Sequence, residues 1–428
     1  MLLDSVLPRL IRHGTLRLRR PDGSTATFGG TRPGPQAAMA LTNRAIFRRL
    51  VMNPGLAFGE GYMDGSVEPI EGSTIYDLLD LMIFNLAQGG SHPALRAGEV
   101  LRWLRRRLLD LNTATRARQN VAHHYDLNGT LYALFLDADL QYSCAYFPTG
   151  RETLEEAQAL KKRHLASKLR LDRPGLEVLD IGSGWGGLAI TLAREHGARV
   201  TGLTLSEEQL AESRARAEAA GLSDRVSFEL MDYRDWKRPM DRIVSVGMFE
   251  HVGINHYTAF FRTVKAALKE DGVALIHAIG QSEGPATTNP WLTKYIFPGG
   301  YSPALSEVVP AAEKAGLWIT DIEILRLHYA MTIAHWRARF AANRNAIKAL
   351  YDERFCRMFE FYLSASELSF RRWGHMNWQM QLTRSADALP LTRDYMLDAE
   401  RAAAYPHDPP PSTGPRQQVK QDAERAEG

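Results

Sequence analysis

The segment Leu179–Gly187, which reads LDIGSGWGG, constrains the fold of this 428-residue chain more than any other feature. It continues an apolar run, Leu176–Asp180, that has the length of a buried strand, and it precedes the helix-length segment Gly187–His196. Glycines at such a junction permit positive φ angles and let a ligand approach the backbone at the carboxyl edge of a parallel sheet. The segment therefore predicts a nucleotide-binding loop in an α/β fold.

Short apolar runs alternate with amphipathic, helix-length segments throughout residues 113–402, which is typical of a parallel sheet with crossover helices. After Leu176–Asp180, the expected strands are Arg199–Thr204, Val226–Leu230, Arg242–Val246, Val273–Ala278, Trp318–Arg326 and the alternating run Met376–Leu382. A helix is expected over Ser206–Ala220, with Ser206 as its N-cap and Gln209 at the capping-box position. We expect a Rossmann-like α/β domain with a mostly parallel, seven-stranded sheet and helices on both faces.

Two flanking segments depart from this pattern. Residues 1–112 combine Gly/Pro-rich turns, short alternating runs and a helical pattern from Ile75 onward, which predicts a small α+β accessory domain that ends in a helical linker. Residues 403–428 are polar and proline-rich, so we expect a disordered tail there.

Positive charge is concentrated near the amino terminus. Residues 1–120 hold sixteen arginines, no lysine and ten acidic residues, although the net charge of the whole chain is only +3. In Leu101–Leu109 (LRWLRRRLL), Leu101, Leu104 and Leu108 share one helical face and four arginines occupy the rest. Such a helix suits an anionic membrane surface, and a linker helix packed on its own protein is the alternative. We expect no nucleic-acid partner.

Composition excludes several classes of protein. A chain with 45% hydrophobic and 24% charged residues is neither wholly disordered nor collagen-like. No apolar run reaches the roughly 18–20 residues that a membrane-spanning helix needs. Cys144 and Cys356 suffice neither for a disulfide framework nor for a thiolate metal site, and His123 and His124 lack the spacing of helical ligands. We expect no metal, and a reducing cytoplasm fits this cysteine usage.

The glycine spacing alone leaves two cofactors open. Gly182, Gly184 and Gly187 satisfy the GxGxxG pattern of NAD-binding proteins, but the second strand ends in Thr204-Leu-Ser206 and has no acid at its tip to bind a ribose. Asp180 two residues before the first glycine, with polar residues after the second strand, is similar to the pattern of class I S-adenosylmethionine (SAM) methyltransferases. The wider pattern favours SAM, and an NAD oxidoreductase stays as an alternative.

A closer resemblance covers nearly the whole chain. Its motifs are His124–Asp126, Gln141–Tyr146 (QYSCAY), Asp232–Arg234, Arg242–Val252 (RIVSVGMFEHV), Lys294–Pro298 and, near the amino terminus, Gly59–Gly65. In these motifs the chain resembles the cyclopropane-fatty-acyl-phospholipid synthase family. The resemblance implies that SAM donates a methyl group to the double bond of an unsaturated phospholipid acyl chain, that a cyclopropane ring then closes, and that the protein is a homodimer. We expect a cytoplasmic enzyme, peripheral at the inner face of the membrane.

This chemistry has specific requirements. An alkene is a poor nucleophile, so methyl transfer leaves a carbocation in the acyl chain, and aromatic faces stabilise a desolvated cation by about 0.5–2 kcal/mol each. The candidates are Tyr125, Tyr142, Tyr146 and Phe147.

The resemblance also implies a proton acceptor. The family binds bicarbonate in a pocket that corresponds to Cys144, Glu250, His277, Ile279 and Tyr329. Backbone N–H groups of Cys144 and Ile279, with imidazole and phenol donors, are expected to hold the anion, and Glu250 is expected to orient it and relay the proton.

For SAM, the resemblance implies residues before the first strand, in the glycine loop and after the second and third strands. They are Tyr142, Ser143, Asp180, Gly182, Gly184, Trp185, Gly186, Thr204, Ser206, Gln209, Asp232, Tyr233 and Arg234. The insertion 280–303 is a candidate lid or wall of the acyl channel. Ser366 stands where family members often have cysteine, which argues against covalent catalysis.

Two further functions stay open. A related SAM enzyme on the same lipids would resolve the cation differently and give a methyl-branched or methylene product. A lipid-surface protein would keep SAM binding without turnover.

Overall fold

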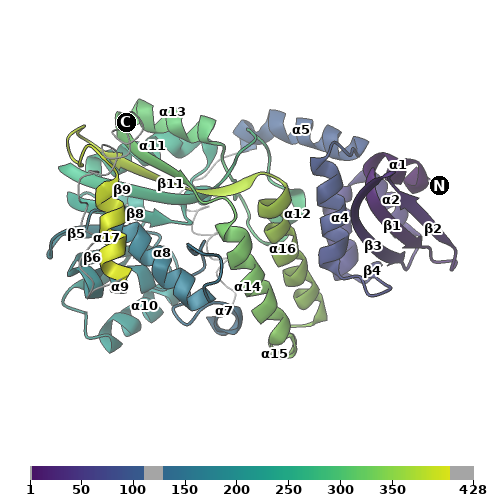
Figure 1. Cartoon of the computed structure of the whole chain (residues 1–428), viewed down its shortest axis with the longest axis horizontal. Coiled ribbons are helices and arrows are strands. Elements are labelled where there is room, and N and C mark those ends of the chain that lie inside the picture. The colour runs from purple at the N-terminus through teal and green to yellow at the C-terminus, as the bar shows by residue number, and fades with distance from the viewer. Residues whose placement is uncertain (1, 110–128, 405–428) are drawn as a thin grey trace, which may run out of the picture.

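The computed structural model describes residues 2–109 and 129–404 (Figure 1). The motif His124–Asp126, with His123 and Tyr125, lies outside the described residues, as does most of the expected tail. Among the residues described, no helix is both long and apolar enough to cross a membrane.

A seven-stranded sheet forms the larger part of the molecule. Its strands are β5 (Glu177–Ile181), β6 (Arg199–Thr204), β7 (Val226–Leu230), β8 (Met240–Val246), β9 (Leu268–Gln281), β10 (Trp318–Ile324) and β11 (His375–Thr383). They lie in the order β10-β11-β9-β8-β5-β6-β7, and β5 to β9 pair in parallel. Only β11, which is antiparallel to both of its neighbours, departs from that direction. The expected α/β fold with a mostly parallel, seven-stranded sheet is confirmed.

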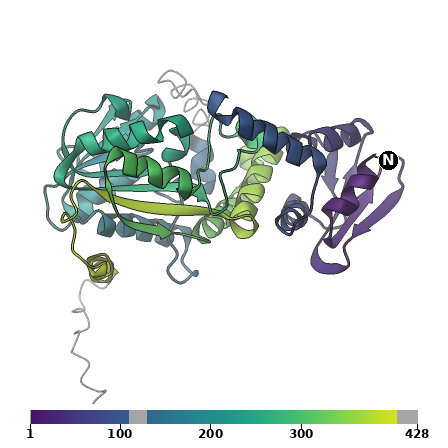
Figure 2. The same cartoon turned by 90° about the horizontal axis from the view of Figure 1, so that it is seen from above.

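Helices cover both faces of this sheet (Figures 1 and 2). They are α8 (Leu154–Lys168), α9 (Gly187–His196), α10 (Glu207–Ala219), α11 (Tyr257–Ala267), α13 (Leu305–Ala315) and α17 (Asp394–Ala404). On one face Phe260 and Val308 belong to the core between the sheet, α11 and α13, and on the other Leu165 and Leu188 belong to the core under α8 and α9. Helix α17 was not expected from the sequence, and it packs against α8.

The amino-terminal region contains a second, smaller sheet. Its elements are α1 (Leu2–Leu10), β1 (His13–Arg19), β2 (Thr25–Gly29), β3 (Arg32–Leu41), α2 (Ala45–Met52), α3 (Pro54–Met63), β4 (Val67–Pro69) and α4 (Ile75–Ala87). The strand order is β2-β1-β3-β4, and Leu16 and Leu18 of β1 are completely buried in its core. Helix α5 (Pro93–Leu109) then runs from this sheet towards the larger one (Figure 2).

A helical layer stands between the two sheets (Figure 1). It is made of α7 (Gly129–Phe135), α12 (Pro290–Tyr295), α14 (His328–Ala342), α15 (Arg344–Leu350) and α16 (Glu353–Arg372). Helix α16 packs against α3 and α4 of the amino-terminal region. Arg357 of α16 pairs with Glu68 at 2.7 Å, and the Tyr76 hydroxyl donates to Glu367 at 3.1 Å. The two parts of the chain thus share a packed interface.

Candidate functional site at the carboxyl edge of the sheet

The glycine loop joins β5 to α9, as the sequence predicted. The N–H groups of Gly182 and Ser183 both donate to the carbonyl of Leu203 at 2.9 Å, which holds the loop against β6. Gly184 has φ +54°, and a Cβ added there would meet no atom within 4 Å. At Gly187, in contrast, a Cβ would clash with the Asp139 carboxylate. The loop is thus packed on one side and open at Gly184, where a ligand has access to the backbone.

Asp180, at the end of β5, has a buried carboxyl group. It is 2% exposed, and its Oδ2 has no hydrogen-bond partner among the described residues. Burial raises the pKa of Asp180 to about 7. A buried carboxylate without a donor is costly, and a cationic group such as the amino group of SAM would relieve that cost. The open loop and this carboxylate fit SAM.

Ser143 is held by a residue that the sequence analysis missed. Lys161 of α8 is fully buried, and its Nζ donates to Gln141 Oε1 at 2.7 Å and to Ser143 Oγ at 2.9 Å. Its charge also lowers the pKa of Asp180. The signal was present, because Lys161 shares one helical face with the apolar residues Leu154 and Leu165.

The residues after β6 form their own hydrogen-bond network. Ser206 caps α10, since its Oγ accepts the N–H of Gln209 at 3.3 Å. The expected reciprocal bond of the capping box is absent among the bonds of these residues: the Gln209 side chain accepts from Thr204 Oγ1 at 2.8 Å, and the Ser206 N–H donates to Thr204 instead. The pair Thr204–Gln209 is therefore prearranged at the strand end.

The segment after β7 is also ordered by its own contacts. Asp232 is 3% exposed, and it accepts from the Arg234 backbone at 3.0 Å and from the Arg234 side chain at 2.8 and 2.6 Å. Burial raises the pKa of Tyr233 to about 12. The carboxylate of Asp232 is thus already paired with a cation.

Trp185 occupies a different place from the rest of the loop. Its indole is 5% exposed and lies edge-on to Tyr132 of α7, with ring centroids 5.9 Å apart. Its carbonyl accepts from Arg216 at 2.6 Å. Its side chain belongs to the apolar core that contains α7.

Glu250 lies directly after β8, in a short 3₁₀ helix, η2 (Phe249–His251). Its Oε1 accepts the N–H of Ile279 at 2.6 Å, and its Oε2, which is buried, has no partner among the described residues. Burial raises the pKa of Glu250 to about 7. A carboxyl group with this pKa can hold or release a proton near neutral pH.

The donors expected for the anion are partly engaged. The N–H of Ile279 is already bound to Glu250, which corrects the expectation that it is available to an anion. The reason is that a buried carboxylate needs a donor of its own. In contrast, no described residue accepts the N–H of Cys144.

His277 lies on β9, completely enclosed. Its ring nitrogens lie 3.1 Å from the side-chain nitrogen of Gln379 and 3.3 Å from that of Asn377, both on β11. Burial and the nearby charge of Lys161 keep the pKa of His277 well below its usual value. His277 is therefore neutral at pH 7 and offers at most one N–H to a ligand.

Aromatic side chains gather around Trp336 of α14. The hydroxyls of Tyr142 and Tyr362 lie 2.8 Å apart, and Tyr142 stacks on Trp336 with ring centroids 5.1 Å apart. Tyr329 packs edge-on to Trp336 at 5.6 Å and to Phe370 at 4.9 Å. The sequence analysis missed Tyr362, Trp336 and Phe370, because their partners are distant in sequence.

Two of the expected aromatics lie against histidines instead. Tyr146 stacks on His164 at 4.1 Å and on His328 at 5.0 Å, and Phe147 stacks on His335 at 5.7 Å. These contacts hold the segment after Cys144 to α8 and α14. Within the described residues, Tyr142 is therefore the only member of the expected aromatic set whose ring packs against Trp336.

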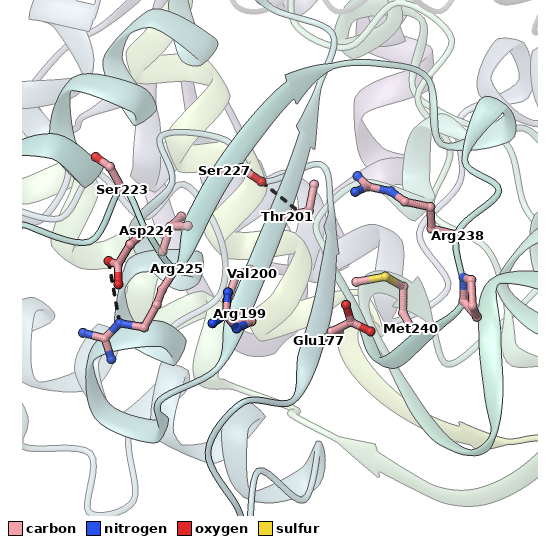
Figure 3. Close-up of a pocket in the computed structure, with 12 residues that line it drawn as sticks. Glu177, Arg199, Val200, Thr201, Ser223, Asp224, Arg225, Ser227, Arg238 and Met240 are labelled. Carbon is pink, nitrogen blue, oxygen red and sulfur yellow. Dashed lines mark hydrogen bonds and ion pairs between the residues drawn. The ribbon is translucent and has the colours of Figure 1, made fainter.

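A hollow at the opposite edge of the sheet is no candidate for the cofactor. It has a volume of about 180 Å³ and lies where β5 to β8 begin, as the side chains of Glu177, Arg199 and Met240 show (Figure 3). Ligands of open parallel sheets bind at the carboxyl ends of the strands. The glycine loop, Asp180 and Glu250 all lie at those ends.

Comparisons with known proteins agree with this geometry. The family model described as mycolic acid cyclopropane synthetase matches residues 112–380. The cyclopropane-fatty-acyl-phospholipid synthase of Escherichia coli strain K12 is 37% identical over 353 residues, which is 82% of this chain and 89% of that protein. The tuberculostearic acid methyltransferase of Mycobacterium tuberculosis is 35% identical over 388 residues, 86% of this chain and 87% of that protein.

A solved structure extends the likeness to three dimensions. The mycolic acid cyclopropane synthase CmaA1, complexed with SAH and CTAB, aligns with a TM-score of 0.59 and 32% identity over 64% of this chain and 99% of that one. The fold is that of class I SAM methyltransferases, and SAM is the cofactor. The chain is therefore a SAM-dependent lipid methyltransferase that belongs to the mycolic acid cyclopropane synthetase family.

Proposed function

We propose that the protein converts the double bond of unsaturated phospholipid acyl chains into a cyclopropane ring. The observation that carries the proposal is Glu250, whose buried Oε2 lacks a partner among the described residues and whose pKa is about 7. Methyl transfer followed by ring closure requires that one proton leave the acyl chain. A buried carboxyl group of this pKa suits that step.

SAM, when bound, supplies an electrophilic methyl group. Asp180, Ser143 and the backbone at Gly184 are the groups proposed to hold it, with Thr204, Gln209 and Asp232 completing the site. Lys161 orients Ser143 and favours the charged form of Asp180. Hydrogen bonds within the protein fix the side chains of Ser143, Thr204, Gln209 and Asp232, so little ordering of these groups is needed on binding.

The aromatic cluster then acts on the acyl chain. The faces of Tyr142, Tyr362 and Trp336 stabilise positive charge in the chain and carry little that would react with it. The same apolar walls keep out water, which would capture the cation as an alcohol. In the balance of the reaction the chain gains one carbon and two hydrogens, because a methyl cation is added and a proton is removed.

Bicarbonate, when bound, would supply the acceptor for that proton. The N–H of Cys144, the ring of His277, Tyr329 and Glu250 are the groups proposed to hold it. Because Glu250 takes the N–H of Ile279 in this structure, the anion would share that donor with Glu250 or rely on the others. We further propose that the enzyme works as a homodimer, cytoplasmic and peripheral on the inner face of an anionic membrane.

The alternative is a methyl-branched or methylene product, and one relative, a tuberculostearic acid methyltransferase, favours keeping it. The experiment is fatty-acid profiling by mass spectrometry of a bacterial host with unsaturated phospholipids, with and without this gene. A cyclopropane product is heavier than its precursor by one CH₂. It resists catalytic hydrogenation under conditions that reduce the exocyclic C=CH₂ double bond of a methylene-branched product. A saturated, methyl-branched product carries two further hydrogens and would show that the proposed ring closure is wrong.

A further inference from the structure

A large apolar cavity lies outside the site described above, between the amino-terminal region and the helical layer. Its volume is about 660 Å³. Leu7, Leu79 and Met82 line it from the amino-terminal side, and Trp291, Phe361 and Ala365 line it from the other. Both parts of the chain contribute to its walls, so the cavity forms only when the two parts pack against each other.

Helix α16 separates the cavity from the aromatic cluster of Tyr142, Tyr362 and Trp336. Phe361, Ala365 and Ser369, at four-residue spacing, line the cavity. The adjacent stripe of the same helix carries Tyr362, which reaches Tyr142, and Phe370, which contacts Tyr329. One helix therefore presents one face to the cavity and the next face to the proposed site of methyl transfer.

The two regions meet near the carboxyl end of α16. His375 lines the cavity and packs edge-on to Phe370 at 5.7 Å, and Phe370 is the residue that contacts Tyr329. At this end of the helix, the rings of His375 and Phe370 therefore connect the cavity wall to Tyr329.

The cavity opens beside α5. Val100 and Trp103 line it and are nevertheless 60% and 50% exposed. Arg102 also lines it, and its Nε donates to Thr287 Oγ1 at 3.3 Å. A guanidinium at the entrance of an apolar cavity matches a molecule with a phosphate at one end and a hydrocarbon chain at the other.

We propose that this cavity binds the second, unreactive acyl chain of the phospholipid, while the reactive chain lies on the other flank of α16 against Tyr142 and Tyr362. The proposal rests on the proposed function, because it assumes a substrate with two chains. The apolar lining suits a hydrocarbon chain, and Arg102 suits the phosphate that both chains share. The enzyme would thus recognise a diacyl lipid by binding its two acyl chains on opposite sides of α16.

The test compares substrates with two chains and with one. The variant Ala365→Phe fills the cavity from α16, and Ala215→Phe is the matched control, since Ala215 is exposed on α10. In detergent micelles, kcat/KM is measured for a diacyl phospholipid with one unsaturated chain and for the corresponding lysophospholipid. We expect Ala365→Phe to lower kcat/KM for the diacyl lipid about tenfold, as overfilling a binding cavity does, and to leave the lysophospholipid within about twofold. Equal effects on both lipids, or none on either, would overturn the proposal.

A binding measurement keeps the test independent of turnover. A saturated diacyl phosphatidylglycerol cannot react, so its affinity for the full-length protein, followed by quenching with brominated acyl chains, reports only on binding. Ala365→Phe should weaken this affinity about tenfold relative to wild type and to Ala215→Phe. If the saturated lipid binds the variant as well as the wild type, the cavity does not hold a chain. If it binds as expected but no ring forms from any unsaturated lipid, the proposed function is wrong and the lipid site stands.

Should Ala365→Phe fail to fold, Ser369→Phe fills the same cavity one helical turn further on and gives the same comparison.

Discussion

Glu250 and Ile279 are joined by a hydrogen bond of 2.6 Å from the backbone of β9 to the carboxylate that follows β8. The bond occupies one oxygen of a buried carboxyl group and leaves the other, Oε2, without a partner among the described residues. It therefore fixes the orientation of the side chain and leaves the second oxygen as the one proposed to receive a proton.

Glu250→Gln should spare SAM binding and lower turnover by on the order of 10²-fold or more, because an amide cannot relay a proton. Initial rates of S-adenosylhomocysteine formation with unsaturated lipid, and calorimetry with SAM, measure the two effects. Removal of bicarbonate from the buffer should slow the wild type and have little further effect on the variant. Full activity of the variant would exclude Glu250 from proton transfer.

The raised pKa of Glu250 also has a consequence for stability. In the unfolded chain this carboxyl titrates near 4.5, and in the folded protein near 7, so the folded state binds the proton more tightly. Its contribution to stability is complete below about pH 4.5 and is lost as the pH rises through about 7. Glu250→Gln removes this dependence.

We therefore expect wild type and Glu250→Gln to have similar unfolding free energies at pH 5, and the variant to be more stable by about 1–3 kcal/mol at pH 8. Urea denaturation of the ligand-free proteins across this pH range provides the measurement. A constant difference between the two proteins at all pH values would mean that burial does not raise this pKa.

The glycine loop and the parallel strands β5 to β9 could be predicted from the sequence, because their signals are local. Asp180 and Gly182 lie within one short motif, and each strand is a short apolar run between helix-length segments. The expected Val273–Ala278 falls inside β9, which extends further at both ends.

The burial of β11 and the packing of α17 depend on contacts between residues that are distant in sequence. The run Met376–Leu382 alternates between apolar and polar residues, which usually indicates a strand with one solvent face. In the structure β11 is buried on both faces, because Gln379 lies against His277 and Gln381 donates to the Lys168 carbonyl. Neither contact, nor the packing of α17 on α8, has a signature in the local sequence.

Gly184→Val should abolish SAM binding. Gly184 has φ +54°, and its missing side chain leaves open the space in which SAM is proposed to lie. Gly221→Val is a matched control, since Gly221 has φ +65°, also meets no atom within 4 Å and lies after α10. Both variants carry the same backbone strain, so calorimetry with SAM separates loss of the site from loss of stability. Unchanged affinity in Gly184→Val would contradict the loop assignment.

Lys161→Met should weaken SAM binding about tenfold at pH 7. Without the lysine, Ser143 loses a donor and the pKa of Asp180 rises further, so that less of Asp180 is ionised at neutral pH. Above about pH 9 Asp180 is ionised in both proteins, and the difference in affinity should shrink. Lys162→Met, which removes the partly buried ion pair with Asp139, is the control. A pH-independent loss of affinity would point to a purely structural role for Lys161.

The last prediction concerns Arg105, Arg106 and Arg107 on α5, beyond the entrance of the cavity at Arg102. Each arginine near an anionic surface contributes about 1 kcal/mol of binding, and salt weakens that contribution. Replacing all three by glutamate should reduce sedimentation with anionic vesicles at low salt, and the gap from wild type should narrow as salt rises. SAM binding should not change.

The control replaces Arg199, Arg225 and Arg238 by glutamate, which changes the net charge equally at the amino-terminal edge of the larger sheet (Figure 3). If both triple variants sediment alike, the position of the charge on α5 is unimportant, and α5 is a packed linker.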